Sequence, residues 1–303
     1  MKSILSLALA AVMGLALLTG CGPAAPASSV SGPDGSGAVS GAVSEPDRPQ
    51  LPPEPQAPSS GELKLNKFSN VELSALSPNI RVERGEDWAV RYDLHNQESV
   101  TRAEVVGDTF YFSSAYQPTP EVDTKDCELV LLIPVGADLN NVSLSTAAGS
   151  IELFNLTVED LSVKSVSGNV ALTHVVSGSL RAESTSGTVT TTSCTAERAR
   201  AESTSGAVKL DGTYQTAELS SVSGTCELYA EVGGSARLQT VSGDITAQAP
   251  FQQLSVKTLG PIVVNGEKHS GKEVILGEGS PALSIESVSG VVRADQNILV
   301  MIQ

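Results

Sequence analysis

Cysteine, histidine and acidic side chains are the residues of this 303-residue chain whose types could do chemistry. The chain has 4 cysteines and 3 histidines. No two cysteines stand at CxxC spacing, and the histidines (His95, His174 and His269) are scattered. We therefore expect no metal site, no cofactor and no disulfide framework.

Paired carboxylates could cleave or eliminate a polysaccharide if they stood at a defined separation. Asp244 and Glu227 are the candidates, but both fall at ordinary outward positions of short repeats, with no long loops to form a cleft. The patterns GxSxG, GxGxxG and GGxGxD are absent. A polysaccharide-active β-helix enzyme is the less favoured alternative, and we expect no enzyme activity and no catalytic residue.

Cys21 is the cysteine with the clearest chemistry. Residues 1–20 begin with one lysine, continue as a short apolar run and end in Leu18, Thr19 and Gly20 directly before Cys21. This ending resembles the bacterial lipobox, which implies cleavage before Cys21 and acylation of its thiol. A transmembrane anchor or a soluble secreted protein are the alternatives, but the run is short for a span of about 20 apolar residues. We expect a lipid-anchored protein of the cell membrane or envelope, outside the cytoplasm.

Residues 21–61 have the composition of a disordered tether. The segment holds nine of the chain's 16 prolines, and glycine, serine and alanine supply most of the rest. Such a segment lacks the apolar surface needed to offset its ordering entropy. It would hold the folded domain roughly 30–40 Å from the anchor.

The charge balance excludes one class of partner. The chain has 19 Lys and Arg against 34 Asp and Glu, a formal net charge of −15. Loss of residues 1–20 would remove Lys2 and make the charge more negative. An acidic chain repels nucleic acid and anionic headgroups, so no nucleic-acid partner is expected.

Residues 62–140 read as strands joined by irregular turns, which we interpret as an N-terminal β-rich cap and first strands. The stretch 87–94 places Trp88 and Tyr92 on one face, and 109–113 places Phe110 and Phe112 together. An aromatic ligand platform is the alternative. Apolar residues at every second position are typical of the buried face of a strand, so we favour a packed core.

From residue 141 to 303 the chain is periodic. The repeats align on a glycine that recurs at steps of 19, 19, 19, 18, 19, 17 and 30 residues, with an insertion at about 265–282. Within each unit, apolar residues alternate with polar ones on both sides of a serine-glycine pair. The aligned glycines are Gly149, Gly168, Gly187, Gly206, Gly224, Gly243, Gly260 and Gly290.

This pattern predicts one strand, a corner and a second strand in each unit. We expect the glycine to supply left-handed backbone angles at the corner. A unit of 18–19 residues is too short to form a hydrophobic core by itself, so the units must stack on one another. The expected fold is all-β, a parallel β-solenoid or β-helix, with right-handed winding favoured. The segment 297–303 would complete the far cap, and Cys194 and Cys226 would be buried as small apolar residues.

The recurrent [ST]-x-SG-x-[VI] unit, together with the leading stretch 127–153, resembles the bacterial putative-adhesin domain of unknown function, a β-strand-repeat family of envelope proteins. The run 277–294 resembles the final coil of that family. The resemblance covers residues 62–303. It implies a β-solenoid in an envelope setting, and it carries over no catalytic residue.

Outward positions of successive repeats carry a regular stripe of charge, which is the candidate binding surface. A self-neutralising solvated face is the simpler interpretation. The favoured function is a non-catalytic surface lipoprotein whose solenoid binds an envelope protein or a glycan. The alternative is an envelope-stress or regulatory accessory that binds a membrane protein. Sequence leaves the oligomeric state open. The stripe residues are Arg181, Glu183, Arg200, Glu202 and Arg237.

Overall fold

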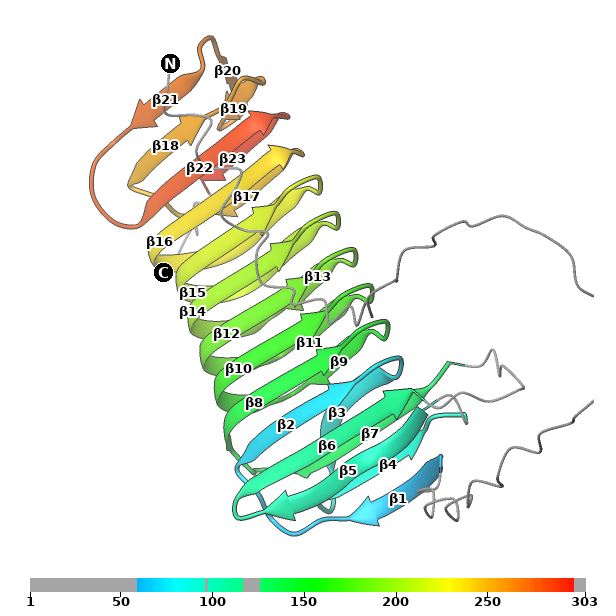
Figure 1. Ribbon diagram of the computed structural model, residues 1–303. Coiled ribbons are helices and arrows are strands. Elements are labelled where there is room, and N and C mark those ends of the chain that lie inside the picture. The colour runs from blue at the N-terminus through cyan, green and yellow to red at the C-terminus, as the bar shows by residue number, and fades with distance from the viewer. Residues whose placement is uncertain (1–58, 96–97, 117–125, 297–303) are drawn as a thin grey trace, which may run out of the picture. The chain divides into compact units, whose positions relative to one another are not determined.

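The computed structural model describes residues 59–95, 98–116 and 126–296. These residues form strands that stack as successive coils, and each coil adds one strand to each of two parallel sheets (Figure 1). Among the described residues, no helix is long and apolar enough to cross a membrane. The predicted all-β parallel solenoid is confirmed.

The first sheet contains the strands that lead into the serine-glycine corners. Its strands are parallel, and each pairs with its neighbour along the stack. The order is β6 (Thr109–Tyr116), β2 (Asn70–Ala75), β8 (Leu139–Thr146), β10 (Thr157–Ser165), β12 (Val176–Ser184), β14 (Cys194–Ser203), β15 (Val208–Ser221), β16 (Cys226–Ser242), β22 (Ala282–Ser289) and β18 (Gln253–Lys257).

The second sheet contains the strands that leave the corners, and it follows the same stacking order. Strands β15 and β16 are long enough to run through both sheets. The other members are β7 (Glu128–Pro134), β3 (Asn79–Gly85), β9 (Ile151–Phe154), β11 (Val170–Thr173), β13 (Val189–Thr192), β17 (Ile245–Ala249), β23 (Val292–Gln296) and β19 (Ile262–Val264).

The stacking order departs from the chain order at the C-terminal end. Strands β22 and β23 were expected to form the closing coil, but they lie between the coil of β16 and β17 and the coil of β18 and β19. The chain skips one level after β17, builds the outer coil and then returns to fill the gap. The expected final coil is therefore corrected to the penultimate level, because its strands pair on both sides.

The N-terminal end has the same arrangement. Strands β2 and β3 lie between the coil of β6 and β7 and the coil of β8 and β9. The parallel stack therefore reaches into residues 62–140, the segment expected to act as a cap. The first strands of the parallel stack, β2 and β3, and the last, β22 and β23, are thus held one level inside it, where fraying must break two ladders rather than one.

Antiparallel strands cover the two outermost coils. At one end β5 (Glu98–Val106) pairs with β6, while β4 (Ala89–Asp93) joins β7 to β1 (Ser60–Lys64). At the other end β20 (Glu267–His269) pairs with β19 and β21 (Glu273–Leu276) pairs with β18. Short, charged or twisted edge strands of this kind oppose edge-to-edge aggregation. The expected insertion at 265–282 supplies two of these covering strands. The expected cap at 297–303 lies outside the described residues.

Alternating side chains fill the space between the sheets. The alternation predicted for the aromatic stretches is confirmed, because Tyr92, Phe110 and Phe112 are buried. Trp88 packs edge-on against Phe68, with ring centres 4.3 Å apart. The cluster of these rings forms part of one continuous core, which agrees with the packed-core interpretation rather than with an exposed aromatic platform.

A buried hydroxyl closes each regular corner. In the coil of β12, Ser184 Oγ donates to the Gly168 carbonyl of the preceding coil (3.0 Å) and accepts from the Gly187 N–H of its own coil (2.9 Å). Ser203 makes the same two bonds one level on. The hydroxyls therefore form a hydrogen-bonded spine along the stack, which explains why serine or threonine recurs three residues before the glycine. The spine comprises Thr146, Ser165, Ser184, Ser203, Ser221 and Thr240.

The corner glycines are needed for a reason other than the expected one. Of the aligned glycines, only Gly290 has a left-handed backbone angle, with φ of 136°. A Cβ built on Gly206 would lie 2.0 Å from the carbonyl oxygen of Gly187, the corner glycine one level below. The expectation of left-handed angles is therefore wrong for the other corners. Glycine is required there because successive backbones approach too closely to admit a side chain.

Candidate functional site

The predicted charge stripe lies on the outward face of the first sheet, and its members neutralise one another. Register places Arg181 beside Arg200 and Glu183 beside Glu202 in neighbouring coils. Each arginine pairs with acids along and across the strands: Arg200 reaches Glu202 at 2.6 Å and Glu218 at 2.8 Å. Arg181 contacts Glu183 and lies 3.8 Å from Glu202.

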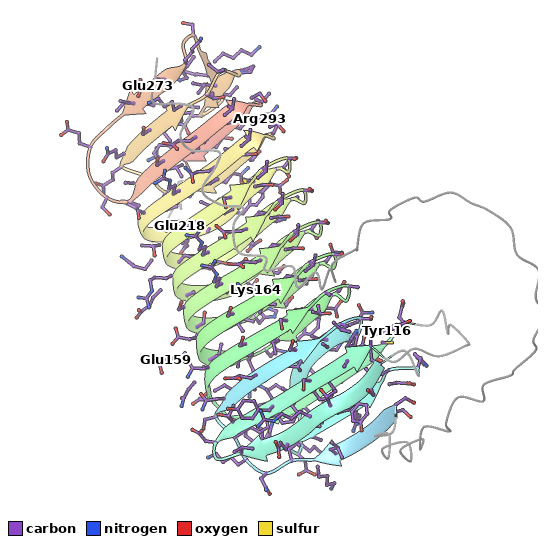
Figure 2. All side chains as sticks on the ribbon, viewed as in Figure 1. Tyr116, Glu159, Lys164, Glu218, Glu273 and Arg293 are labelled. Atoms are coloured by element: carbon purple, nitrogen blue, oxygen red, sulfur yellow. The ribbon has the colours of Figure 1, made fainter. Side chains whose placement is uncertain are left out.

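Two members of this network were not in the predicted stripe. Lys164 pairs with Glu183 at 3.1 Å, and Glu218 closes the other end (both are labelled in Figure 2). Arg237 belongs to the stripe by register but pairs separately with Glu286 at 3.4 Å. Burial lowers the pKa of the Arg200 guanidinium, but Glu202 and then Glu218 outweigh it, so that the pKa is raised. The arginines are therefore held in ion pairs and are poorly placed to receive an anionic ligand.

We predict that Glu202→Gln lowers the free energy of unfolding by no more than about 1 kcal/mol at low salt, because partly exposed pairs contribute little. The loss should shrink as salt is added, since ions screen exposed charges beyond about 10 Å at 0.1 M. Urea unfolding of the parent and the variant at two salt concentrations measures this. A loss of several kcal/mol that salt does not change would show that the network holds the coils together.

The other residues singled out in the sequence, Asp244 and the two cysteines of the repeats, lie in contacts between coils or in the core. Asp244 accepts a hydrogen bond from the Val291 N–H (2.8 Å) and lies 3.8 Å from Arg293, so it ties two coils together. Cys194 and Cys226 are fully buried free thiols, as predicted. Burial raises the pKa of Cys226 to about 12. In the described part of the chain, no group of three or more His, Cys, Asp and Glu side chains is arranged to hold a metal ion.

Sequence reasoning also missed a buried carboxylate at the N-terminal end. Glu98 is 1% exposed and accepts hydrogen bonds from the backbone N–H groups of Leu76 (3.3 Å) and Ser77 (2.6 Å) and from the Ser114 hydroxyl. Its contacts lie at the corner after β2, where it satisfies backbone donors. Glu98 is a structural group by these contacts.

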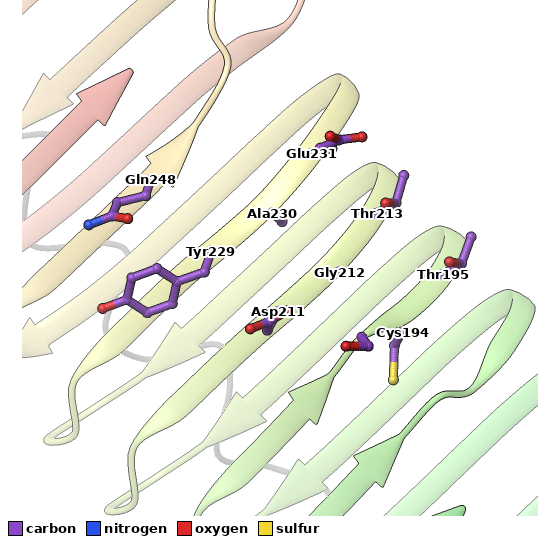
Figure 3. Close-up of a pocket in the computed structure, with 10 residues that line it drawn as sticks. Cys194, Thr195, Asp211, Gly212, Thr213, Tyr229, Ala230, Glu231 and Gln248 are labelled. Atoms are coloured by element: carbon purple, nitrogen blue, oxygen red, sulfur yellow. The ribbon is translucent and has the colours of Figure 1, made fainter. Parts of the chain in front are cut away.

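A shallow groove interrupts the regular stack at the second corner, where the coils turn out of the second sheet. It has a volume of about 410 Å³. Figure 3 shows two rows of side chains along it. Asp211, Tyr229 and Gln248 form one row, and Thr195, Thr213 and Glu231 form the other. Between the rows, Gly212 and Ala230 form the floor.

The groove exists because small residues replace large ones in one inward column. Cys194, Gly212 and Ala230 are in register, and Gly212 has a φ of 150°. A Cβ on Gly212 would lie 1.9 Å from the Cys194 carbonyl oxygen, so this position admits no side chain. The backbone is therefore depressed at Gly212, and the flanking side chains stand above it.

A buried tyrosine supports the depressed backbone from inside. Tyr214 is 1% exposed, and its hydroxyl donates to the Asp211 carbonyl (3.1 Å) and lies 2.8 Å from the Thr191 hydroxyl. The Asp211 N–H donates in turn to Thr191 Oγ1 (3.0 Å). Burial raises the pKa of Tyr214, so its hydroxyl stays protonated and keeps donating. The phenol fills the interior at the level where the neighbouring coils carry Ala196 and Val232, and it fixes the position of Asp211.

One aromatic ring stands in the groove wall. Tyr229 is half-buried, and the Lys209 ammonium lies 4.9 Å from its ring centre. Burial and then the Glu227 carboxylate raise the pKa of Tyr229, so the phenol remains protonated at neutral pH. A sequence signal for the groove existed in the glycine step of 18 residues at this coil and in a glycine, Gly212, at an inward position.

Comparison with known proteins finds one matching family model. The model for the Toastrack DUF4097 family matches residues 69–259, which run from just before β2 to just after β18. No curated protein matches the chain.

Several solved structures are similar to this chain. A "putative adhesin" from Bacteroides fragilis is 22% identical, with 78% of this chain and 95% of that chain covered and a TM-score of 0.45. A "putative adhesin" from Parabacteroides distasonis is 12% identical over 77% of this chain and 95% of that one, with a TM-score of 0.44. A "putative lipid binding protein" from the same species is 15% identical over 78% and 96%, with a TM-score of 0.46.

Proposed function

The chain belongs to the Toastrack DUF4097 family, and on that premise we propose that it is a non-catalytic, adhesin-like lipoprotein of the bacterial cell envelope. Its solenoid presents a binding surface outside the cytoplasm. The observation that supports the binding role is the regularity of the stack. Strands near both ends pair on two sides, and the coils between them hold outward side chains in fixed rows. Ordered, pre-positioned side chains lower the entropy cost of binding.

The non-catalytic part of the proposal rests on the environment of the acidic residues. The stripe glutamates are engaged by arginines, and Asp244 is held by Arg293 and a backbone N–H. A catalytic carboxylate pair needs an acid and a base or nucleophile that are free to act on a bound substrate. These contacts instead support structural roles for Asp244, one of the two acids considered as catalytic candidates, and for the stripe glutamates.

The envelope location rests on the lipobox-like ending at Cys21. Residues 1–20 would act as the export signal, and residues 21–61 would tether the folded domain. Both segments lie almost entirely outside the described residues, so the assignment depends on their sequence. More than one acyl chain on Cys21 would give stable anchoring, where a single chain binds only marginally.

We expect Cys21→Ser to leave the protein unacylated and to move it from the membrane fraction to the soluble fraction. Metabolic labelling with a fatty-acid analogue and membrane fractionation measure the two effects. Cys226→Ser, which leaves the proposed lipid site intact, is the matched control and should stay acylated. Recovery of the Cys21→Ser variant in the membrane fraction at the parent level would contradict the anchoring proposal.

A further inference from the structure

The groove at Gly212 combines three irregularities in an otherwise periodic stack. The inward-facing column of residues has no side chain at Gly212, and the large phenol of Tyr214 fills the interior nearby. The register of β15 with β16 shifts opposite the adjacent glycines Gly233 and Gly234. Bulges and local breaks of a rule concentrate where a protein positions a site. The residues that depart from the repeat act together here, since they lower one stretch of backbone and hold it in place.

The polar lining of the groove fits a ligand rich in hydroxyl groups. Asp211 and Glu231 offer carboxylate acceptors, while Thr195, Thr213 and Gln248 can both donate and accept. Among the described lining residues there is no lysine or arginine, which disfavours an anionic ligand. The scarcity of large apolar side chains in the lining disfavours a lipid chain.

The Tyr229 ring adds an apolar surface beside these polar groups. Lys209 reaches the ring from the neighbouring coil and helps to fix it against the sheet. A sugar ring carries apolar C–H faces and polar hydroxyl edges, so it can pack on an aromatic ring and hydrogen-bond to flanking carboxylates at once. The volume of about 410 Å³ lies within the range usual for small-ligand sites, about 300–1,000 Å³.

The geometry points to a glycan-binding subsite in this groove, in which a neutral saccharide packs on Tyr229 and hydrogen-bonds to Asp211, Glu231 and Gln248. The inference rests on the proposed binding function and names its ligand class. Because exposed residues line the groove and it follows an outer corner of the stack, it suits an internal segment of a glycan chain. The supporting contacts of Tyr214 with Asp211 and Thr191 pre-position the site.

The test is saturation-transfer NMR on the full-length protein in detergent micelles, with cellotriose, chitotriose, maltotriose and mannotriose as separate probes. At least one trisaccharide should bind saturably. Tyr229→Ala should weaken that binding by about tenfold or more, as loss of an aromatic anchor does. Thr213→Trp, at an exposed position, should block the groove without touching the core. Tyr111→Ala, which removes a half-buried tyrosine stacked with Arg102 elsewhere, is the matched control and should bind normally.

Circular dichroism shows whether each variant remains folded, so a loss of binding in the folded Thr213→Trp variant supports the subsite even if Tyr229→Ala is unstable. The inference is overturned if no trisaccharide binds, or if binding is equal in the parent and both groove variants. Tighter binding of an oligolysine peptide than of every trisaccharide would also overturn it, by assigning the carboxylates to a cation. If no trisaccharide binds but a protein partner binds elsewhere on the solenoid, the proposed binding function stands and this glycan subsite is overturned.

Discussion

Gly206→Ala will destabilise the protein by about 3 kcal/mol or more, at the upper end of what an overpacked interior costs. The alanine Cβ would lie 2.0 Å from the Gly187 carbonyl oxygen, and the obstructing atom is backbone rather than a flexible side chain. Relief requires neighbouring coils to separate, which breaks the ladders between β12 and β14 and between β13 and β15 and the Ser203 bonds of the spine. The midpoint of urea unfolding, followed by circular dichroism, measures the loss.

Gly136→Asn is the matched control for Gly206→Ala. Nothing lies within 4 Å of a Cβ built on Gly136, and asparagine tolerates its left-handed φ of 83°. This variant should unfold within about 1 kcal/mol of the parent. If Gly206→Ala unfolds at the same urea concentration as Gly136→Asn, then close approach of the coils is not what requires glycine at the corners.

Ser184→Ala should cost about 2 kcal/mol, because two hydrogen bonds are lost and two buried backbone groups are left without partners. The two groups left without a hydrogen-bond partner are the Gly168 carbonyl and the Gly187 N–H, which bond the Ser184 hydroxyl at 3.0 and 2.9 Å. The side chain is 6% exposed, so water does not readily replace the hydroxyl. Urea unfolding again measures the effect.

Two controls separate the spine from the rest of the corner. Ser184→Thr should be nearly neutral, because Thr146 and Thr240 occupy the same position in other coils and make the same kind of bonds. Ser186→Ala changes an exposed serine of the same corner and should shift stability by no more than about 0.5 kcal/mol. Equal losses for Ser184→Ala and Ser186→Ala would contradict the structural role of the buried spine.

The repeated part of the fold was accessible from sequence because each coil repeats the same local problem. Alternation places Leu180 and Ala182 inward and Arg181 outward, and the structure confirms all three. The recurring serine-glycine pair predicted a corner at the correct residues. Its mechanism was not accessible, because the clash at Gly206 is with a carbonyl one coil away and becomes visible only when coils are stacked.

The ends of the stack could not be predicted from the same periodicity. Consecutive elements usually lie side by side, and that rule misplaced β22 and β23 at the end of the stack. The glycine at 290 resembles the others in sequence, and nothing local reveals that it pairs with Gly243 on one side and Gly260 on the other. The choice between neighbouring levels is made by the long-range pairing of whole strands.

The groove escaped prediction for a related reason. Gly212 and Tyr214 each look like an ordinary exception when a single repeat is read. Only the stacked coils show that the phenol of Tyr214 supports Asp211 while the missing side chain at 212 opens the surface above. The charge stripe was easier to find because its members recur at the repeat spacing, but the pairing of Arg200 with both Glu202 and Glu218 depends on side-chain reach.

In situ crosslinking on intact cells tests most directly whether the displayed solenoid is a binding surface. The parent chain and the Gly206→Ala variant would be crosslinked at the cell surface at a temperature at which circular dichroism shows the parent folded and the variant unfolded. Captured proteins and glycans would be identified by mass spectrometry. The account predicts a partner that is captured by the parent, recovered chemically unchanged, and lost with the folded stack. A membrane-protein partner would favour the regulatory form of the binding role. Capture of the same molecules by parent and unfolded variant, or recovery of a cleaved glycan, would contradict a non-catalytic binding surface.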